Sequence, residues 1–338
     1  MKPTDPTYSR YAICREMLET PRVIREFPTD RVQALQAPGH RVTLTGEGSS
    51  RILPAGHLVH TARRRGYGRI VFSESAYDAA GFDLTDTHVF VASNSGKTAE
   101  CVHLIRAARE RGAASRIVGM AGDGDTPVAA ESDEAYLLTC GAEQAVAATK
   151  SVVEQALVYD IYFRIHENRT LPDLDALAQR FEKALSADVP AEMTEAVAAA
   201  PVIYFAGTND GVAEELTLKA NEIVRARSDF LPGTYAVHGI EEVMDPRDVV
   251  IWIDPPEEYE AKFRTVLSDG VGLSVFAVSS RETSFPTVRV PAAEDEETTA
   301  YLYLAAGWSM LVEAGIAAGL DMDKPERARK VGNEYTGG

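Results

Sequence analysis

The chain contains little that could cross-link it or bind a metal. Its three cysteines, Cys14, Cys101 and Cys140, are far apart in the sequence, which excludes a disulfide framework and the close spacing of a metal-binding motif. No apolar run approaches the roughly 20 residues that span a bilayer, and the N-terminus has no apolar core of a signal peptide. We therefore expect a cytoplasmic protein, not bound to a membrane, whose cysteines are buried as small hydrophobic side chains.

Positive charge is also scarce. The 338 residues include 51 acidic and 34 basic side chains, which gives a formal net charge of −17. This balance disfavours nucleic acids and anionic membranes as partners. Only eight residues are lysines, so a lysine beside a polar turn is a candidate for binding a negatively charged ligand.

Strand-like apolar runs alternate with segments in which apolar residues recur at three- and four-residue spacing. Strands are expected at 41–45, 69–73, 89–92, 116–119, 135–138, 201–206, 249–253, 273–278 and 287–290. One or two helices are expected within 11–37, which Pro21 and Pro28 interrupt, and single helices at 52–65, 99–111, 150–165, 172–187, 212–227, 258–269 and 297–318. This alternation predicts an α/β fold with mostly parallel sheets covered by helices on both faces.

The second half of the chain repeats this pattern at low similarity, and 338 residues exceed one comfortable core. We therefore predict two tandem, doubly wound, flavodoxin-like domains. The expected order is an N-terminal helical segment (1–40), a first domain (41–168), a helical connector (169–192), a second domain (193–320) and a charged C-terminal tail (321–338).

Three turns rich in small residues follow strands in the first half: Gly46–Ser50, Ser93–Thr98 and Gly141–Thr149. Ligands of open α/β sheets bind beyond the carboxyl ends of the strands, so these turns could converge. The Ser93–Thr98 turn leads directly into a helix, where hydroxyls, N–H groups and the helix dipole favour negative charge. A capped loop would explain any single turn, but the three together indicate a phosphate site.

The three turns together resemble those of the sugar isomerase domain, a family of phosphosugar-binding α/β domains. Gly48-Ser49-Ser50 resembles its first substrate turn, Ser93-Asn94-Ser95-Gly96-Lys97-Thr98 its phosphate loop and Val146-Ala147-Ala148-Thr149-Lys150 its third loop. The resemblance implies a phosphate bound by the hydroxyls of the phosphate loop. The expected substrate-binding residues are Ser49, Ser50, Ser93, Asn94, Ser95, Thr98, Val146 and Ala148.

The second half resembles the isomerase part of glutamine–fructose-6-phosphate amidotransferase and its glutaminase-free relatives. The matching segments are a helix with a lysine and a glutamate (215–223), His238-Gly239, and a tail that ends in a functional lysine (323–331). Three positions depart from the family pattern: Asn221 replaces a second lysine, Ile240 replaces a proline and Lys97 replaces a glutamate.

Four residues of this half could carry chemistry. Lys219 and Glu222 are three apart on a predicted helix and share a face. Glu222 could carry a proton between C1 and C2 of a sugar phosphate, and Lys219 could shuttle the hydroxyl proton or hold the enediol oxygen; a surface ion pair is the alternative. His238 could open the sugar ring, and the resemblance implies that a neighbouring subunit of a homodimer supplies it. Lys330 could form a Schiff base if the tail covers the site, or be a solvated tail lysine.

These residues predict an enzyme, a phosphosugar isomerase acting on hexose or amino-sugar 6-phosphates without a metal or cofactor. It would be a glucosamine-6-phosphate deaminase/isomerase or an ammonia-dependent synthase. Since no glutaminase domain or N-terminal cysteine nucleophile precedes the match, glutamine hydrolysis is not expected. Two alternatives stay open: an isomerase or deglycase for another phosphosugar adduct, and a non-catalytic phosphosugar-binding regulator.

Overall fold

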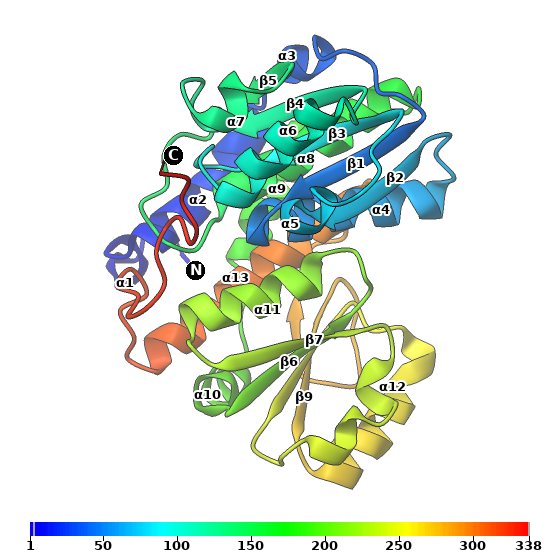
Figure 1. Ribbon diagram of the computed structural model, residues 1–338. Coiled ribbons are helices and arrows are strands. Elements are labelled where there is room, and N and C mark those ends of the chain that lie inside the picture. The colour runs from blue at the N-terminus through cyan, green and yellow to red at the C-terminus, as the bar shows by residue number, and fades with distance from the viewer. Residues whose placement is uncertain (3, 337–338) are drawn as a thin grey trace. The chain divides into compact units, whose positions relative to one another are not determined.

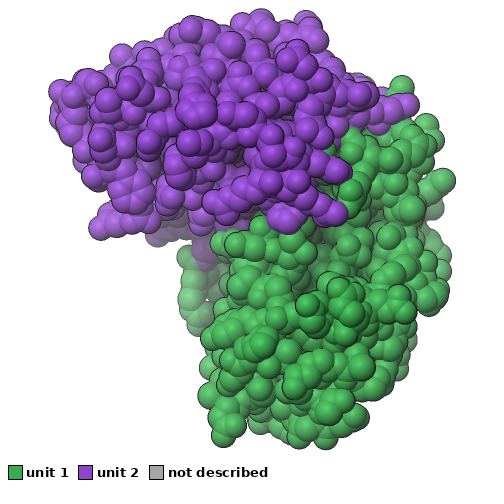
Figure 2. All heavy atoms as spheres, turned by 90° about the vertical axis from the view of Figure 1, so that its right-hand side faces the viewer, with its two compact units in different colours: residues 1–21, 144–147, 175–327 green, residues 22–143, 148–174, 328–338 purple. Residues whose placement is uncertain are grey.

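A computed structural model describes residues 1–2 and 4–336 (Figure 1). The chain forms two compact units, coloured separately in Figure 2: unit 1 is Met1–Pro21, Gln144–Ala147 and Asp175–Arg327, and unit 2 is Arg22–Glu143, Ala148–Leu174 and Ala328–Gly338. The expected N-terminal segment and C-terminal tail are thus each divided between the two units. Gly337 and Gly338, at the end of that tail, lie outside the described residues.

Unit 2 contains a five-stranded parallel sheet with the order β2-β1-β3-β4-β5. Its strands are β1 (Arg41–Gly46), β2 (Ile70–Ser75), β3 (Thr87–Ala92), β4 (Arg116–Ala121) and β5 (Glu134–Leu137). The helices of this unit include α3 (Thr29–Gln33), which precedes the sheet, and α4 (Ile52–Arg65), α5 (Ala76–Ala79), α6 (Ala99–Arg111), α7 (Pro127–Ala130) and α8 (Lys150–His166). Only the last turn of α2 (Ala12–Arg25) belongs to unit 2, because unit 1 extends to Pro21. The predicted parallel α/β fold is confirmed.

The central strand β3 shows why the sheet needs helices on both faces. Its residues are almost all buried, and successive side chains of a strand point to opposite faces. Val89 and Val91 pack in one apolar cluster with residues of α5, α6 and α7. Phe90, between them, makes edge-on ring contacts with Tyr159 and Tyr162 of α8. The continuous apolar run therefore reflects burial on both sides.

Unit 1 contains the second parallel sheet, with the order β10-β9-β8-β6-β7. Its strands are β6 (Val202–Gly207), β7 (Arg227–Pro232), β8 (Val249–Ile253), β9 (Ser274–Ser279) and β10 (Thr287–Arg289). The helices of this unit include α1 (Pro6–Ser9), most of α2, most of α9 (Leu174–Leu185), α10 (Ala191–Ala199), α11 (Val212–Ile223), α12 (Glu257–Phe263), a π-helix (Arg264–Val271) and α13 (Thr299–Ala317). Read from its second edge, this sheet has the same strand order as the first, so β6 corresponds to β1 and β8 to β3.

Helix α13 is the most apolar helix of unit 1. Together with the preceding turn (Glu296–Ala317), it is long and apolar enough, by length and composition, to cross a membrane, which the sequence analysis did not anticipate. However, 83% of its most apolar window is buried, as expected for a core helix. Gly307 permits close packing here, because an added Cβ would lie 2.4 Å from a methyl group of Leu216 on α11.

Strand β7 is the main error of the sequence-based prediction, which continued the preceding helix to residue 227. The helix ends at Ile223, and Arg225 adopts a positive φ of 58°. β7 then pairs in parallel with β6. Because β7 is an edge strand with mostly half-buried or exposed residues, it lacks the apolar run that marks the central strands.

Candidate functional site

The carboxyl end of β1 carries the first predicted substrate turn. Ser49 is buried within a 3-10 turn (Gly48–Ser50), and Ser50 Oγ lies 3.4 Å from the side-chain amide of Gln155 on α8. Gly46 allows this turn to approach the next strand, since an added Cβ would lie 2.8 Å from the carbonyl oxygen of Ala92. The turn therefore lies directly beside the end of β3.

The predicted phosphate loop forms at the end of β3, as expected from the sequence. The Oγ of buried Ser93 lies 2.8 Å from Thr98 Oγ1 and 3.4 Å from Ser95 Oγ, so three hydroxyls gather where α6 begins. Gly96 adopts a φ of +64°, and an added Cβ would lie 2.0 Å from Thr126 Oγ1. The loop thus requires glycine at this position, and its hydroxyls lie at a helix N-terminus, where the helix dipole favours negative charge.

The third predicted loop is divided between the units. Val146 belongs to the Gln144–Ala147 segment of unit 1, where the backbone N–H groups of Gln144 and Ala145 donate to the buried Glu16 carboxylate. Ala148 belongs to unit 2. Both Val146 and Ala148 are half-buried.

Glu143 is a buried carboxylate of unit 2 that the sequence analysis missed. Its side chain is fully shielded from solvent, and the hydroxyls and backbone N–H groups of Thr149 and Ser151 donate to it. The side-chain amide of Asn94 donates as well, at 3.0 Å. Burial acts to raise the pKa of Glu143, but the Lys330 ammonium and these donors outweigh it and hold the pKa below its ordinary value. Glu143 is therefore an ionised buried group.

The end of the chain docks on the phosphate loop of unit 2. The backbone N–H of Tyr335 donates to the Lys97 carbonyl, and that of Ala99 donates to the Asn333 carbonyl. The Tyr335 hydroxyl accepts a hydrogen bond from Arg106 on α6 at 2.6 Å. These contacts attach the Asn333–Tyr335 segment to unit 2, although most residues of the tail, Lys330 included, stay exposed.

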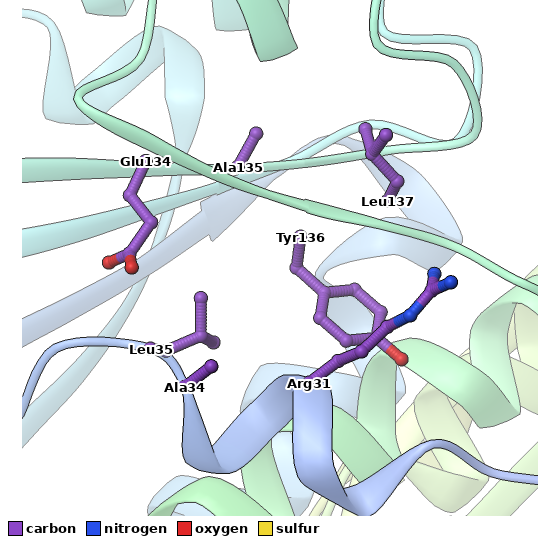
Figure 3. A pocket seen from close by; sticks show the side chains of 7 residues that line it. All are labelled: Arg31, Ala34, Leu35, Glu134, Ala135, Tyr136 and Leu137. Carbon is purple, nitrogen blue, oxygen red and sulfur yellow. The ribbon is translucent and has the colours of Figure 1, made fainter.

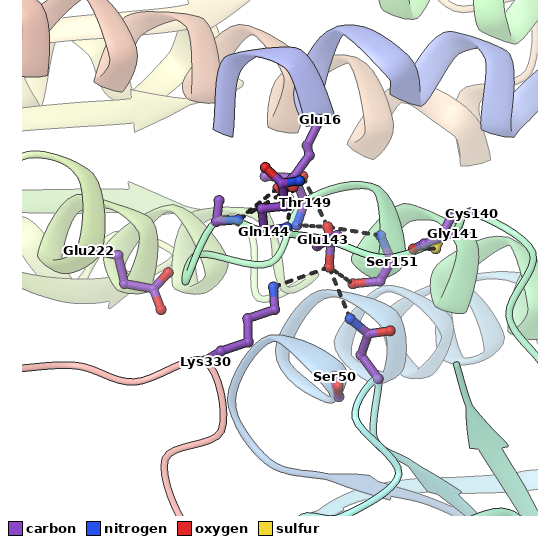
Figure 4. Close-up of polar contacts among 12 residues, drawn as sticks. Glu16, Ser50, Cys140, Gly141, Glu143, Gln144, Thr149, Ser151, Glu222 and Lys330 are labelled. Atoms are coloured by element: carbon purple, nitrogen blue, oxygen red, sulfur yellow. Dashed lines mark hydrogen bonds and ion pairs between the residues drawn. The ribbon is translucent and has the colours of Figure 1, made fainter. Parts of the chain in front are cut away.

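Lys330 lies in this docked segment, and its Nζ is 3.6 Å from Glu143 Oε2 (Figure 4). Its side chain is about one third exposed, whereas Glu143 is fully buried. Lys97, the position that departs from the family pattern, pairs with Glu334 of the tail at 3.8 Å. The structure thus brings a lysine of the tail to the same unit as the hydroxyl cluster.

Helix α11 of unit 1 carries a buried ion-pair cluster. The Lys219 ammonium lies 3.1 Å from Glu215 Oε1 and 2.8 Å from Glu222 Oε2. Lys219 and Glu215 are fully buried, and Glu222 is 22% exposed. Burial alone would lower the pKa of Lys219, but the two carboxylates raise it above its ordinary value. The predicted Lys219–Glu222 pair is present, but it is buried rather than on the surface.

Glu215 was not among the predicted site residues, although it lies four positions before Lys219 and therefore on the same helix face.

His238 lies elsewhere in unit 1, in an exposed loop after a 3-10 turn (Tyr235–Val237), where its Nε2 lies 3.1 Å from the Thr234 hydroxyl. Among the described residues, no group of three or more His, Cys, Asp or Glu side chains is placed to hold a metal ion.

Two other places in the structure, the hollow beside β5 and the strand ends of unit 1, are weaker candidates for an anion site than the phosphate loop. A hollow of about 430 Å³ runs along edge strand β5 (Figure 3), but the residues of β5 and of the 31–35 segment that line it include no predicted site residue. In unit 1, the ends of β6 and β8, which correspond to β1 and β3, carry the aspartates Asp210 and Asp254 instead of hydroxyl clusters. Two carboxylates at this edge would repel a phosphate.

The half-buried Asp210 leads to a testable prediction about stability. Burial, together with Asp254, raises the pKa of Asp210 to about 6, whereas its ordinary value is 3.8. Ionised Asp210 therefore costs stability, and the cost grows from about pH 4 until it levels off above about pH 6. We expect Asp210→Asn to raise the free energy of unfolding by about 1–2 kcal/mol at pH 8, because asparagine removes the buried charge and can still accept the hydrogen bond from the Val212 N–H.

Urea unfolding at pH 8 and pH 5 would measure this effect, which should shrink at the lower pH. Asp245→Asn is the matched control. The pKa of Asp245 is lowered to about 2 by hydrogen bonds from Arg247, so neutralising Asp245 should bring no gain. An equal gain at both pH values, or from both variants, would contradict the assignment to Asp210.

Part of the chain matches a known protein family. The model of the SIS domain matches residues 74–165, which include the phosphate loop. The chain is 25% identical over 276 residues to glutamine–fructose-6-phosphate aminotransferase from Methanothermobacter thermautotrophicus, a match that covers 77% of this chain and 46% of that protein. The chain spans about half the length of the curated relatives it matches.

Two solved structures share the fold. One is the C-terminal domain of glucosamine-fructose-6-phosphate aminotransferase from Francisella tularensis, with a TM-score of 0.77 and 16% identity, covering 93% of this chain and 98% of that one. The other is glucosamine-6-phosphate deaminase from Thermotoga maritima, with a TM-score of 0.72 and 17% identity, covering 94% and 99%. The chain therefore contains a SIS domain and is homologous to the isomerase part of glutamine–fructose-6-phosphate aminotransferase.

Proposed function

We propose that this protein is a cytoplasmic phosphosugar isomerase that acts on hexose or amino-sugar 6-phosphates, as a glucosamine-6-phosphate deaminase/isomerase or an ammonia-dependent synthase. The observation that carries the proposal is the cluster of Ser93, Ser95 and Thr98 hydroxyls at the start of α6, with the tail that carries Lys330 docked on the same loop. All three relatives described above are named for fructose 6-phosphate or glucosamine 6-phosphate. Their names support this substrate class.

The phosphate would bind the three hydroxyls and the N–H groups at the start of α6, with Ser49 nearby. Ser50, Val146 and Ala148 would contact the sugar. Asn94 would contribute to the site through its hydrogen bond to Glu143. In a chain with a net charge of −17, such local donors would offset the repulsion between protein and substrate.

Lys330 would form the covalent intermediate. The Lys330 ammonium would first give up a proton, and its neutral amine would add to the C2 carbonyl of the open-chain ketose phosphate. The resulting carbinolamine would take a proton back and lose water to give a protonated Schiff base. The proton on the adjacent carbon then becomes more acidic, because the cationic C=N group withdraws electrons. The phosphate on its hydroxyl cluster would keep the substrate oriented during this step.

Proton transfer would be carried by the residues of unit 1. The Glu222 carboxylate would remove the proton from C1 or C2 and return it to the other carbon. Lys219 would hold the enediol oxygen or move the hydroxyl proton. His238 would open the sugar ring by acid–base transfer, and we propose that a homodimer supplies it from the neighbouring subunit.

Two assays would test the proposed function. The protein is incubated with glucosamine 6-phosphate, and separately with fructose 6-phosphate plus ammonium, while ammonia and hexose phosphates are followed. We expect turnover in at least one direction. Tight phosphosugar binding without turnover of either would favour a regulator, and turnover of another phosphosugar alone would favour the alternative isomerase or deglycase.

Borohydride trapping would test the role of Lys330. Reduction in the presence of a ketose phosphate should leave a stable adduct on Lys330, located by peptide mass spectrometry. Lys330→Met should abolish the adduct. Lys324→Met is the matched control, because Lys324 is also a tail lysine but is 83% exposed and pairs with Asp321. An adduct on another lysine, or none in the unmodified protein, would remove the Schiff-base role.

A further inference from the structure

The contact between Lys330 and Glu143 suggests a role that the proposed function leaves open. A buried carboxylate is stable only where donors or an opposite charge compensate for its lost hydration. Glu143 has both: Asn94, Thr149 and Ser151 donate to it, and the Lys330 ammonium lies 3.6 Å away. Its charge is therefore fixed in place beside the reactive nitrogen.

The same donors argue against Glu143 as a base. Hydrogen bonds to a carboxylate favour its ionised form and reduce its tendency to accept a proton. The pKa of Glu143 is correspondingly below its ordinary value. The distance of 3.6 Å also exceeds that of a good hydrogen bond. The group is thus arranged to act through its charge.

We propose that Glu143 is the counter-ion of the Lys330 Schiff base and the residue that positions Lys330. The nitrogen of Lys330 is positive both as the ammonium and as the protonated Schiff base, so a fixed negative charge beside it favours the protonated adduct over the neutral imine. The protonated adduct is also the form that acidifies the neighbouring carbon. This inference rests on the proposed function, because it assumes that Lys330 forms the adduct.

Three variants separate charge from shape. Glu143→Gln keeps the size of the side chain and removes the charge, whereas Glu143→Asp keeps the charge and shortens the side chain. Glu154→Gln is the matched control: Glu154 is a fully buried carboxylate on α8 that accepts from Thr139 and Cys140. Loss of that carboxylate disturbs a neighbouring turn without removing the charge beside Lys330.

The test measures the rate of borohydride-trapped adduct formation at saturating fructose 6-phosphate, together with the affinity for inorganic phosphate. Glu143→Gln should slow trapping about 10- to 100-fold, because borohydride reduces the protonated Schiff base and less of the adduct stays protonated without the neighbouring charge. The affinity for inorganic phosphate, which depends on the hydroxyls of Ser93, Ser95 and Thr98, should change less than the trapping rate. Glu143→Asp should retain more of the rate than Glu143→Gln, and Glu154→Gln should retain nearly all of it. A purely structural role would instead favour the glutamine of equal size over the shorter aspartate.

The outcomes distinguish a failure of this inference from a failure of the proposed function. If the unmodified protein forms no adduct, the Schiff base and the counter-ion both fail. If the unmodified protein and Glu143→Gln form it at equal rates, only the counter-ion fails. Should Glu143→Gln not fold, Lys330→Met replaces it: loss of the ammonium should lower the Tm by roughly 2–4 °C relative to Lys324→Met. Equal Tm values for these two lysine variants would overturn the pairing.

Discussion

Lys219→Met is expected to lower the free energy of unfolding by about 3–5 kcal/mol, because it removes one partner of a buried ion pair. The ammonium of Lys219 is fully buried between Glu215 and Glu222. Methionine fills a similar volume but leaves the buried Glu215 carboxylate without its positive partner. That carboxylate must then take up a proton or admit water, and both responses cost stability.

Urea denaturation at pH 7 would measure the loss, with Lys324→Met as an exposed lysine control. The double variant Glu215→Gln/Lys219→Met should recover part of the stability, since it removes the buried negative charge together with the positive one. If the free energy of unfolding of Lys219→Met lay within about 1 kcal/mol of that of the unmodified protein, the cluster would have no structural role. A double variant less stable than Lys219→Met would show that the uncompensated charge is not the cause.

Helices and strands that bury one complete face were predicted well from the sequence, because their apolar residues recur with a regular period. The helix predicted from Ile52 to Arg65 has the same bounds in the structure, because its apolar stripe and the following glycine, a left-handed C-cap, mark both its face and its end. Strand β7 was missed because its pairing with β6 depends on backbone hydrogen bonds at a sheet edge. An edge strand can form from polar residues that carry no periodic signal.

The site was predicted only in part, because some of its residues are close together in the sequence and others are brought together by the fold. The hydroxyls of the phosphate loop are local in the sequence, so the turn that gathers Ser93, Ser95 and Thr98 could be recognised before the structure was known. Glu143 could not, because its importance comes from burial and from Lys330, which is 187 residues away in the chain. Position 143 lies within the predicted third turn, so an acidic residue among small ones was the available signal.

The contacts of the C-terminal tail could not be predicted either, because they join residues that are distant in the sequence. Its charged, glycine-ending sequence is typical of a frayed terminus. The structure instead shows an antiparallel bridge between Thr98 and Glu334, and the Tyr335 ring packs beneath the Arg106 guanidinium at 4.5 Å. These contacts join segments more than 200 residues apart, and no local pattern encodes them. They are also what holds the Lys330 segment on unit 2.

Glu222→Gln is expected to lower kcat for the isomerisation by about 10²–10⁴-fold, the usual contribution of a positioned general base. Glutamine has the same shape but cannot accept the carbon-bound proton. The fold should survive, because Lys219 keeps its buried partner Glu215 and Glu222 is the partly exposed member of the cluster. Since the phosphate loop is untouched, KM for the sugar phosphate should change little, which is the pattern of a group that acts in the transition state.

Steady-state kinetics in both directions would measure the loss, and deuterium incorporation from D₂O into the substrate would show whether the carbon-bound proton is still removed. Glu214→Gln, on the same helix, is the matched control and should leave both readings near those of the unmodified protein. Glu222→Gln and Lys219→Met should also differ in kind: the first should slow the reaction alone, whereas the second should slow the reaction and also destabilise the fold. If Glu222→Gln kept its activity and its exchange, Glu222 would be only a partner of Lys219, and the base would have to lie elsewhere.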